Sequence, residues 1–150
     1  MLLPDDLIVK KNCSKSMINV HQKYKSSVMA SMQVDKNTVS RWGIYNLSKR
    51  LSKSDYLISD VVEKPSIKDA PSNKAVIGRY ILPKTIFKKL KNQNSGNGSE
   101  IHITDAIQSL IKDNENFIAH NFSGKYLDCG TMNGYINSGK KISNLWNYAW

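Results

Sequence analysis

The stretch YLISDVVEKPSIKDAPSNKAVIGRYIL, residues 56–82, decides the fold class because it carries two apolar runs separated by a turn-rich loop. The first run, residues 56–63, is rich in β-branched residues and is stopped by Pro65, and the second run, residues 75–82, has the pattern of another strand. Pro83 then suits the first turn of a helix. The stretch therefore predicts two strands followed by a helix.

The alternation of strands and helices continues on both sides of this stretch. We expect further strands at residues 2–9, 27–34, 42–47 and 117–122, and further helices at residues 16–24, 104–111 and 132–142, with Thr104 as a helix cap. The Asn/Gly/Ser-rich segment 92–99 is expected to be the most flexible loop. Helices that alternate with strands predict an α/β fold in which helices cover the faces of a sheet.

Length and charge limit the function classes. A chain of 150 residues with 40% hydrophobic and 23% charged side chains fits one globular domain. The formal charge of +10 comes from 22 Lys and Arg against 12 Asp and Glu, but only Arg41, Arg50 and Arg79 are arginine. Phosphate and base readout favours arginine, so we interpret the lysines as a solvated face and expect no nucleic-acid partner.

The cysteines and the N-terminus indicate the compartment. Cys13 and Cys129 form neither a CxxC pair nor a secreted disulfide scaffold. Asp5 and Asp6 stand where a signal peptide would be basic, and no apolar run reaches the roughly 18 residues of a membrane span. We therefore expect a cytoplasmic protein without a membrane partner.

Charged residues at the ends of apolar runs are the candidates for a site. Asp5 is expected to end the first strand, Glu63 and Lys64 end another, and Asp128 lies in an Asp-Cys-Gly turn. In open α/β sheets, ligands bind beyond the carboxyl ends of strands, so these groups are expected to face one crevice. Together with phosphate oxygens and water, Asp5 and Asp128 would suit the oxygen shell of Mg²⁺. Taken singly, each carboxylate is more often a helix cap or turn former.

Glu63 and Lys64 allow two interpretations. A glutamate can accept hydrogen bonds from two sugar hydroxyls while the adjacent lysine places a point charge on a phosphate, and Pro65 is expected to hold Lys64 extended. The alternative is an exposed pair at a strand end, worth less than about 1 kcal/mol. Gly43, next to Trp42, either permits close approach of the backbone to a ligand or is a β-bulge glycine.

Other catalytic signatures are missing from the sequence pattern. We find no P-loop, no G-x-G-x-x-G and no Ser/His/Asp set. The three histidines have no cysteine or histidine partner at metal-ligand spacing and are expected to be structural or solvated. They are His21, His102 and His120.

Five motifs in a fixed order carry a resemblance to a known family. They are VVEKP at 61–65, APSN at 70–73, AVIGRY at 75–80, GSEI with TDAI at 98–101 and 104–107, and LDCG at 127–130. From Leu3 to about Leu145, the chain resembles the C-terminal part of bacterial UTP:glucose-1-phosphate uridylyltransferase, also called UDP-glucose pyrophosphorylase. The resemblance implies a nucleotide-diphospho-sugar transferase fold, an α/β fold with a Rossmann-like mixed sheet, here without the N-terminal nucleotide-binding half.

The resemblance also implies an activity and residue roles. The reaction would form UDP-glucose and pyrophosphate from UTP and glucose 1-phosphate with Mg²⁺. Asp5 and Asp128 would hold the metal, and Gly43 and Glu63 would bind the sugar. Lys64 would bind the sugar phosphate and act as the catalytic residue.

The departures from the family predict a truncated enzyme. The glycine-rich loop that binds UTP in the family has no counterpart before Leu3. The UTP-binding site, or UTP seat, is therefore expected to be mostly absent, and the chain is expected to be inactive alone. Such a chain would be the product of a split or decayed gene. Residues 1–145 would be the sugar-phosphate-binding part and residues 146–150 a divergent tail. The expected partners are a separate N-terminal half and further copies of the chain, which would associate through Met132, Tyr135 and Ile136.

Three alternatives stay open. In the first, the chain is a non-catalytic remnant that acts at most as a sugar-phosphate-binding or subunit-interaction module. In the second, it is a complete small protein. A thymidine-nucleotide relative is also compatible with the motifs, because the base-reading residues of the family lie in the absent half.

Overall fold

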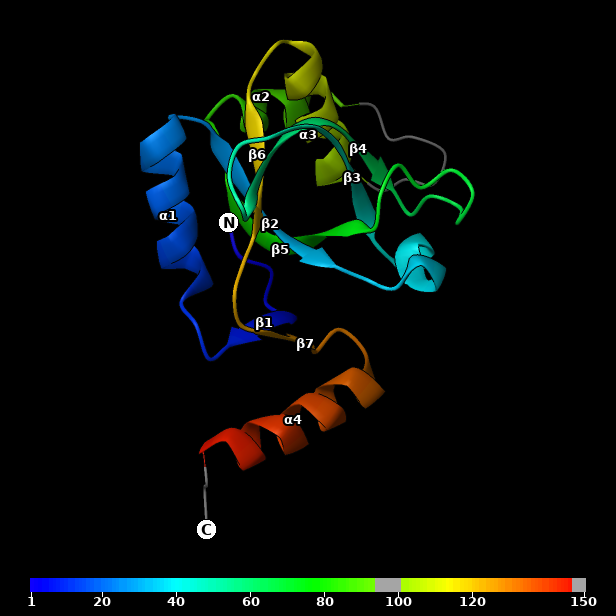
Figure 1. The fold of residues 1–150 in the computed structure, drawn as a ribbon. Helices are drawn as coiled ribbons and strands as arrows, with labels where there is room; N and C mark the ends of the chain where they lie inside the picture. The colour runs from blue at the N-terminus through cyan, green and yellow to red at the C-terminus, as the bar shows by residue number, and fades with distance from the viewer. Residues whose placement is uncertain (94–100, 147–150) are drawn as a thin grey trace.

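The computed structural model describes residues 1–93 and 101–146 (Figure 1). Most of the segment 92–99, expected to be flexible, and most of the expected tail 146–150 lie outside these residues. Five strands close into a barrel in the order β2 (Ser27–Gln33), β5 (Lys74–Ile81), β3 (Gly43–Arg50), β4 (Asp55–Glu63) and β6 (Phe117–Asn121).

The barrel is a mixed sheet, as expected, because β2 and β6 are parallel and the other neighbours are antiparallel. Its closure differs from the open sheet assumed from the sequence. Strands β3 and β4 form a long antiparallel pair, and β4 reaches β6 through its first residues, from Asp55 to Leu57. That pairing brings β6 between β4 and β2 and removes the free edges of the sheet.

A separate two-stranded sheet lies beside the barrel. It pairs β1 (Asp6–Val9) with β7 (Lys125–Asp128) in antiparallel register. The segment before β1 runs along β5, where the Leu3 N–H donates to the Gly78 carbonyl at 2.8 Å. Asp5 therefore precedes a strand rather than ending one, which corrects the expectation of a strand over residues 2–9.

The helices are α1 (Cys13–Tyr24), α2 (Ile86–Lys91), α3 (Ile103–Lys112) and α4 (Met132–Trp146), and a 3₁₀ helix η1 spans Lys36–Arg41. Thr104 is not a helix cap: the N-cap position of α3 is His102, and Thr104 is buried in the first turn.

Helix α4 lies beside the β1–β7 sheet, away from the barrel (Figure 1). Among the described residues, no helix has the length and hydropathy that crossing a bilayer requires.

The core has two parts because successive strand residues face opposite sides. On β2, Met29 packs in the cluster that contains α3, whereas Val28 packs with α1. On β6, Phe117 and Ile118 divide in the same way. Both strands are therefore buried on both sides, which explains their nearly continuous apolar runs.

Candidate functional site

Gly43 and Glu63 lie opposite each other at one end of the barrel. They are register partners where β3 begins and β4 ends, and both line a pocket of about 220 Å³. A Cβ at position 43 would lie 3.2 Å from the Glu63 Oε2 atom and 3.2 Å from the Val76 side chain. The absence of a side chain on Gly43 therefore keeps space open beside the Glu63 carboxylate.

Lys64 follows Glu63 directly, and its side chain is exposed. Its N–H donates to the Trp42 carbonyl at 3.0 Å, which extends the β3–β4 ladder by one step. The backbone of Lys64 has a φ of 43°, so the expectation that Pro65 holds it extended is wrong. Left-handed geometry costs a non-glycine residue roughly 1–2 kcal/mol, and here the buried Pro65 and the ladder hydrogen bond hold it in place.

A second carboxylate, that of Asp6, enters the pocket from the N-terminal segment. The Gly78 N–H donates to Asp6 Oδ2 at 2.6 Å, and the Tyr126 hydroxyl donates to Asp6 Oδ1. The Arg79 guanidinium donates to the Leu3 carbonyl at 3.0 Å and also to the Asp6 carbonyl. These bonds fix the segment that carries Asp5 against β5.

Asp5 and Asp128 converge beside Gly130. A Cβ at Gly130 would lie 2.9 Å from Asp5 Oδ2 and 3.4 Å from Asp128 Oδ1, which keeps these two oxygens within about 7 Å of each other, so that small side-chain movements could bring them to one ion. The Cys129 N–H donates to the Asp5 carbonyl at 2.8 Å, and the Gly130 N–H donates to Asp128 Oδ1 at 2.9 Å. Two residues 123 positions apart are thus held together by the turn after β7.

Arg41 connects the two groups of residues. Its Nη2 atom lies 3.7 Å from Asp128 Oδ2, and the residue also lines the pocket of Gly43 and Glu63. The sugar-site candidates and the metal-site candidates therefore lie on either side of one guanidinium. Sequence reasoning assigned Arg41 no role, because an exposed arginine at the end of a polar segment has no distinctive local pattern.

Two tyrosines in this region have raised pKa values because they are buried near several carboxylates. Burial raises the pKa of Tyr80 far above its ordinary value, and the carboxylates of Asp6, Glu63 and Asp5 add to the effect. Burial also raises the pKa of Tyr126, with further contributions from its hydrogen bond to Asp6 and from nearby carboxylates. Both phenols therefore stay neutral, and Tyr126 donates its proton to Asp6.

The donor chemistry of Asp5 and Asp128 fits a hard divalent cation. Carboxylate oxygens are the ligands that Mg²⁺ prefers, and it usually takes one or two from protein while phosphates and water complete its octahedron. The described residues contain no cluster of three or more His, Cys, Asp or Glu side chains placed for a metal. A cation held by this pair would therefore need oxygen ligands from a bound substrate.

Thr104 is a further candidate that sequence reasoning placed wrongly. Its hydroxyl is buried and has no hydrogen-bond partner within residues 1–93 and 101–146, and the residue lines the same pocket. The Thr104 methyl group would lie 3.5 Å from a Cβ at Gly43. A buried hydroxyl beside an open pocket is available for a ligand.

A Ser/His/Asp set is present, although the sequence pattern did not indicate one. His120 lies between Asp55 and Ser16 within hydrogen-bonding distance of both. The Ser16 hydroxyl donates to the Cys13 carbonyl at 2.7 Å, and Ser16 does not line the Glu63 pocket. This set is a structural link among α1, β4 and β6, which agrees with the expectation that His120 is structural.

Comparisons with known proteins match nearly the whole chain. A family model described as nucleotidyl transferase matches residues 1–144. The chain is 38% identical over 141 residues to a UTP–glucose-1-phosphate uridylyltransferase of Pseudomonas aeruginosa, covering 92% of this chain and 50% of that protein. It is 36% identical over 143 residues to a UTP–glucose-1-phosphate uridylyltransferase 2 of Streptococcus pyogenes serotype M1, covering 92% and 48%.

Solved structures give the same picture. An apo UDP-glucose pyrophosphorylase superposes with a TM-score of 0.89 at 40% identity, covering 95% of this chain and 53% of that one. A UDP-glucose pyrophosphorylase complexed with UDP-glucose superposes with a TM-score of 0.87 at 41% identity, covering 95% and 55%. The chain thus spans about half the length of the curated relatives it matches.

Proposed function

Because the chain belongs to the nucleotidyl transferase family, we propose that it forms the sugar-phosphate side of a UTP–glucose-1-phosphate uridylyltransferase. The complete enzyme would make UDP-glucose and pyrophosphate from UTP and glucose 1-phosphate. One observation carries the proposal: the open space beside Gly43 faces the Glu63 carboxylate, next to Lys64 and across Arg41 from the Asp5–Asp128 pair.

The sugar would occupy the pocket of Gly43 and Glu63. The Glu63 carboxylate can accept hydrogen bonds from two neighbouring hydroxyls, and the bare backbone of Gly43 permits close approach of the ring. The buried Thr104 hydroxyl, which has no partner in the part of the chain that the structure describes, would complete the polar contacts from the α3 side. A pocket of about 220 Å³ can take one hexose ring.

The phosphate would lie between Lys64 and the acidic pair. The exposed Lys64 ammonium can place its charge on a phosphate oxygen and hold it toward the reaction partner. Asp5 and Asp128 would hold Mg²⁺, which neutralises charge on the reacting phosphates. Arg41, through its ion pair, would keep the Asp128 carboxylate oriented.

The reaction is a phosphoryl-group substitution without a covalent enzyme intermediate. A phosphate oxygen of glucose 1-phosphate attacks the α-phosphorus of UTP in line, the bond to the β-phosphate breaks, and pyrophosphate leaves. The contribution of this chain is positioning, which is worth up to roughly 7–11 kcal/mol when both substrates are bound. We propose that a separate N-terminal half supplies the UTP seat, with residues 1–145 as the sugar-phosphate part.

A cytoplasmic location accompanies this proposal. Cys13 and Cys129 are both free, and a reducing compartment keeps such thiols unpaired.

Calorimetric titration of the chain with glucose 1-phosphate, with and without Mg²⁺, tests the proposal. We expect saturable binding that Lys64→Ala weakens by about 10-fold or more, since a charged contact is lost. Lys68→Ala is the matched control, because Lys68 is also exposed and lies on the same loop. Equal binding by the wild type and the Lys64→Ala variant would contradict the proposed phosphate contact.

Turnover separates the enzyme from a non-catalytic remnant. Pyrophosphate release is measured for the chain alone and after mixing with the N-terminal half of a relative such as the Pseudomonas aeruginosa protein. We expect turnover only in the mixture. Turnover by the chain alone near 1 per second would show that the UTP seat lies within it. If neither the chain nor the mixture releases pyrophosphate although the chain binds the sugar phosphate, the non-catalytic remnant is favoured.

A further inference from the structure

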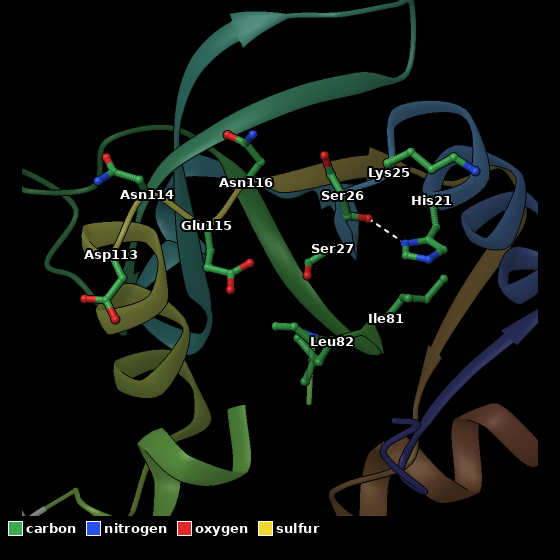
Figure 2. Close-up of a pocket in the computed structure, with 11 residues that line it drawn as sticks. His21, Lys25, Ser26, Ser27, Ile81, Leu82, Asp113, Asn114, Glu115 and Asn116 are labelled. Atoms are coloured by element: carbon green, nitrogen blue, oxygen red, sulfur yellow. Dashed lines mark hydrogen bonds between the residues drawn. The ribbon is translucent and has the colours of Figure 1, made fainter. Parts of the chain in front are cut away.

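A second pocket, of about 490 Å³, lies at the other end of the barrel strands (Figure 2). It opens where β2 and β6 begin and where α1 and α3 end, and it shares no lining residue with the pocket of Glu63. Ile81 lines it, whereas Val76 of the same strand lines the Glu63 pocket. Five residues of extended chain place these two side chains about 17 Å apart, so the two pockets are separate sites.

Two left-handed residues shape this second pocket. Lys25 has a φ of 52° after α1, and Asn114 has a φ of 66° after α3. The Lys25 N–H donates to the His21 carbonyl at 2.8 Å, and the Glu115 N–H donates to the Leu110 carbonyl at 3.0 Å. Both helix ends are thus capped by their own backbone, and the sharp turns leave a space between the two helices.

Ser27 points into this space without a partner. The residue is only 8% exposed, and its hydroxyl makes no hydrogen bond with any of the residues that the structure describes. Figure 2 shows the Ser27 hydroxyl and the Glu115 carboxylate turned toward the same central region. Because Ser27 lines the pocket, its hydroxyl can exchange hydrogen bonds with a ligand or water there.

The other polar groups of the pocket are already occupied or lie at its rim. The Asp113 carboxylate lies 2.6 Å from the Lys89 ammonium, and His21 Nδ1 is held 2.7 Å from the Ser26 carbonyl. Lys25 is exposed at the edge. Glu115 is therefore the carboxylate of this pocket that no side chain among the described residues occupies, and it can receive hydrogen bonds from a ligand.

The charges disfavour an anion in this position. The carboxyl ends of α1 and α3 carry partial negative charge, and the Glu115 carboxylate adds a full one. One free carboxylate is too few for a dedicated divalent-cation site. The side chains of Ile81 and Leu82 form an apolar wall below the polar groups (Figure 2).

We propose that this pocket binds an uncharged polyhydroxylated molecule of monosaccharide size. A sugar hydroxyl can donate to Glu115 while it accepts from Ser27, and the C–H face of the ring packs on Ile81 and Leu82. The site selects the free sugar over its phosphate because the phosphate would meet the Glu115 charge and the two helix ends. This proposal does not depend on the activity proposed for the Glu63 pocket.

Amide NMR of the assigned chain tests it, with D-glucose and D-glucose 1-phosphate titrated separately to about 50 mM, a range that covers Kd values near 1–10 mM. We expect D-glucose to shift the amides of Ser27, Glu115 and Asn116 with saturation. Glucose 1-phosphate is expected to shift the amides of Gly43 and Glu63 instead, and those of the second pocket less than glucose does.

Matched variants assign the site. Glu115→Gln and Ser27→Ala are each expected to weaken glucose binding by about 10-fold while keeping the circular dichroism of the wild type. Glu63→Gln, the same change in the other pocket, is expected to leave the Ser27 shifts intact. No saturable shift with glucose, unchanged shifts in both variants, or a larger response to glucose 1-phosphate at these amides would overturn the proposal.

Discussion

The imidazole of His120 on β6 lies 2.7 Å from the Asp55 carboxylate on β4, 65 residues away in the chain, and both side chains are buried. The other ring nitrogen lies 3.0 Å from the Ser16 hydroxyl of α1. The Ser16 hydroxyl also donates to the Cys13 carbonyl at 2.7 Å, so the ring, the carboxylate and the hydroxyl form one connected set of polar contacts. A buried chain of polar contacts thus joins α1 to the barrel where β4 meets β6.

Removing the ring should therefore destabilise the fold. We expect His120→Ala to lower the free energy of unfolding by about 3–5 kcal/mol, because the buried Asp55 charge loses its partner. Urea denaturation measures the change. His21→Ala is the control, since His21 is exposed, and its effect should stay below about 1 kcal/mol. A comparable loss in both variants would show that the buried pair is not the cause.

Gly78 should tolerate no side chain. A Cβ there would lie 2.3 Å from Asp6 Oδ2 and 2.5 Å from the Leu3 Cβ, so Gly78→Ala must displace the segment that carries Asp5 and Asp6. We expect a loss of about 1–3 kcal/mol in thermal or urea unfolding, together with weaker Mg²⁺-dependent binding of glucose 1-phosphate. Unchanged stability would contradict the close contact of this segment with β5.

Gly139→Ala in α4 is the matched control for that substitution. A Cβ at Gly139 meets no atom of the described residues within 4 Å, so we expect the change only to improve helix propensity. The variant should gain roughly 0.5–1 kcal/mol in stability.

Alkaline pH should unfold the protein through its buried tyrosines. Burial raises the pKa values of Tyr45, Tyr80 and Tyr126, so the folded state keeps their protons where the unfolded chain releases them near pH 10. Stability is therefore fully present below about pH 10 and falls as the pH rises further. Tyrosinate absorbance should show three of the seven tyrosines ionising only as the chain unfolds. Seven equivalent tyrosines in the folded protein would contradict this.

Helix α4 should mediate self-association. Met132 is 75% exposed and Tyr135 65% exposed, and Ile136 adds apolar surface on the same helix. Exposed apolar patches of this kind usually mark an interaction surface. Light scattering should show a mass that rises with concentration, and the double change Met132→Ser, Tyr135→Ser should suppress the rise. A monomer at all concentrations would contradict the expected homo-oligomer.

The sequence was sufficient for features that depend on neighbours in the chain. Apolar periodicity and turn residues predicted the bounds of β4 and of β5 to within one residue. The order of the five motifs indicated the family. The residues singled out for the site, Asp5 with Asp128 and Gly43 with Glu63, also lie together in the structure. Motifs of this kind combine a strand end with a turn, which is local information.

Only the tertiary structure decided how these local features meet. Barrel closure depends on pairing β4 with β6, and the link of Asp55, His120 and Ser16 depends on that closure, which no local pattern encodes. The left-handed backbone of Lys64 is held by its contact with Trp42, against the usual preference of a residue before proline. Propensity and periodicity act over a few residues, whereas these contacts join segments many residues apart. The contacts therefore stabilise the protein only once the chain has folded.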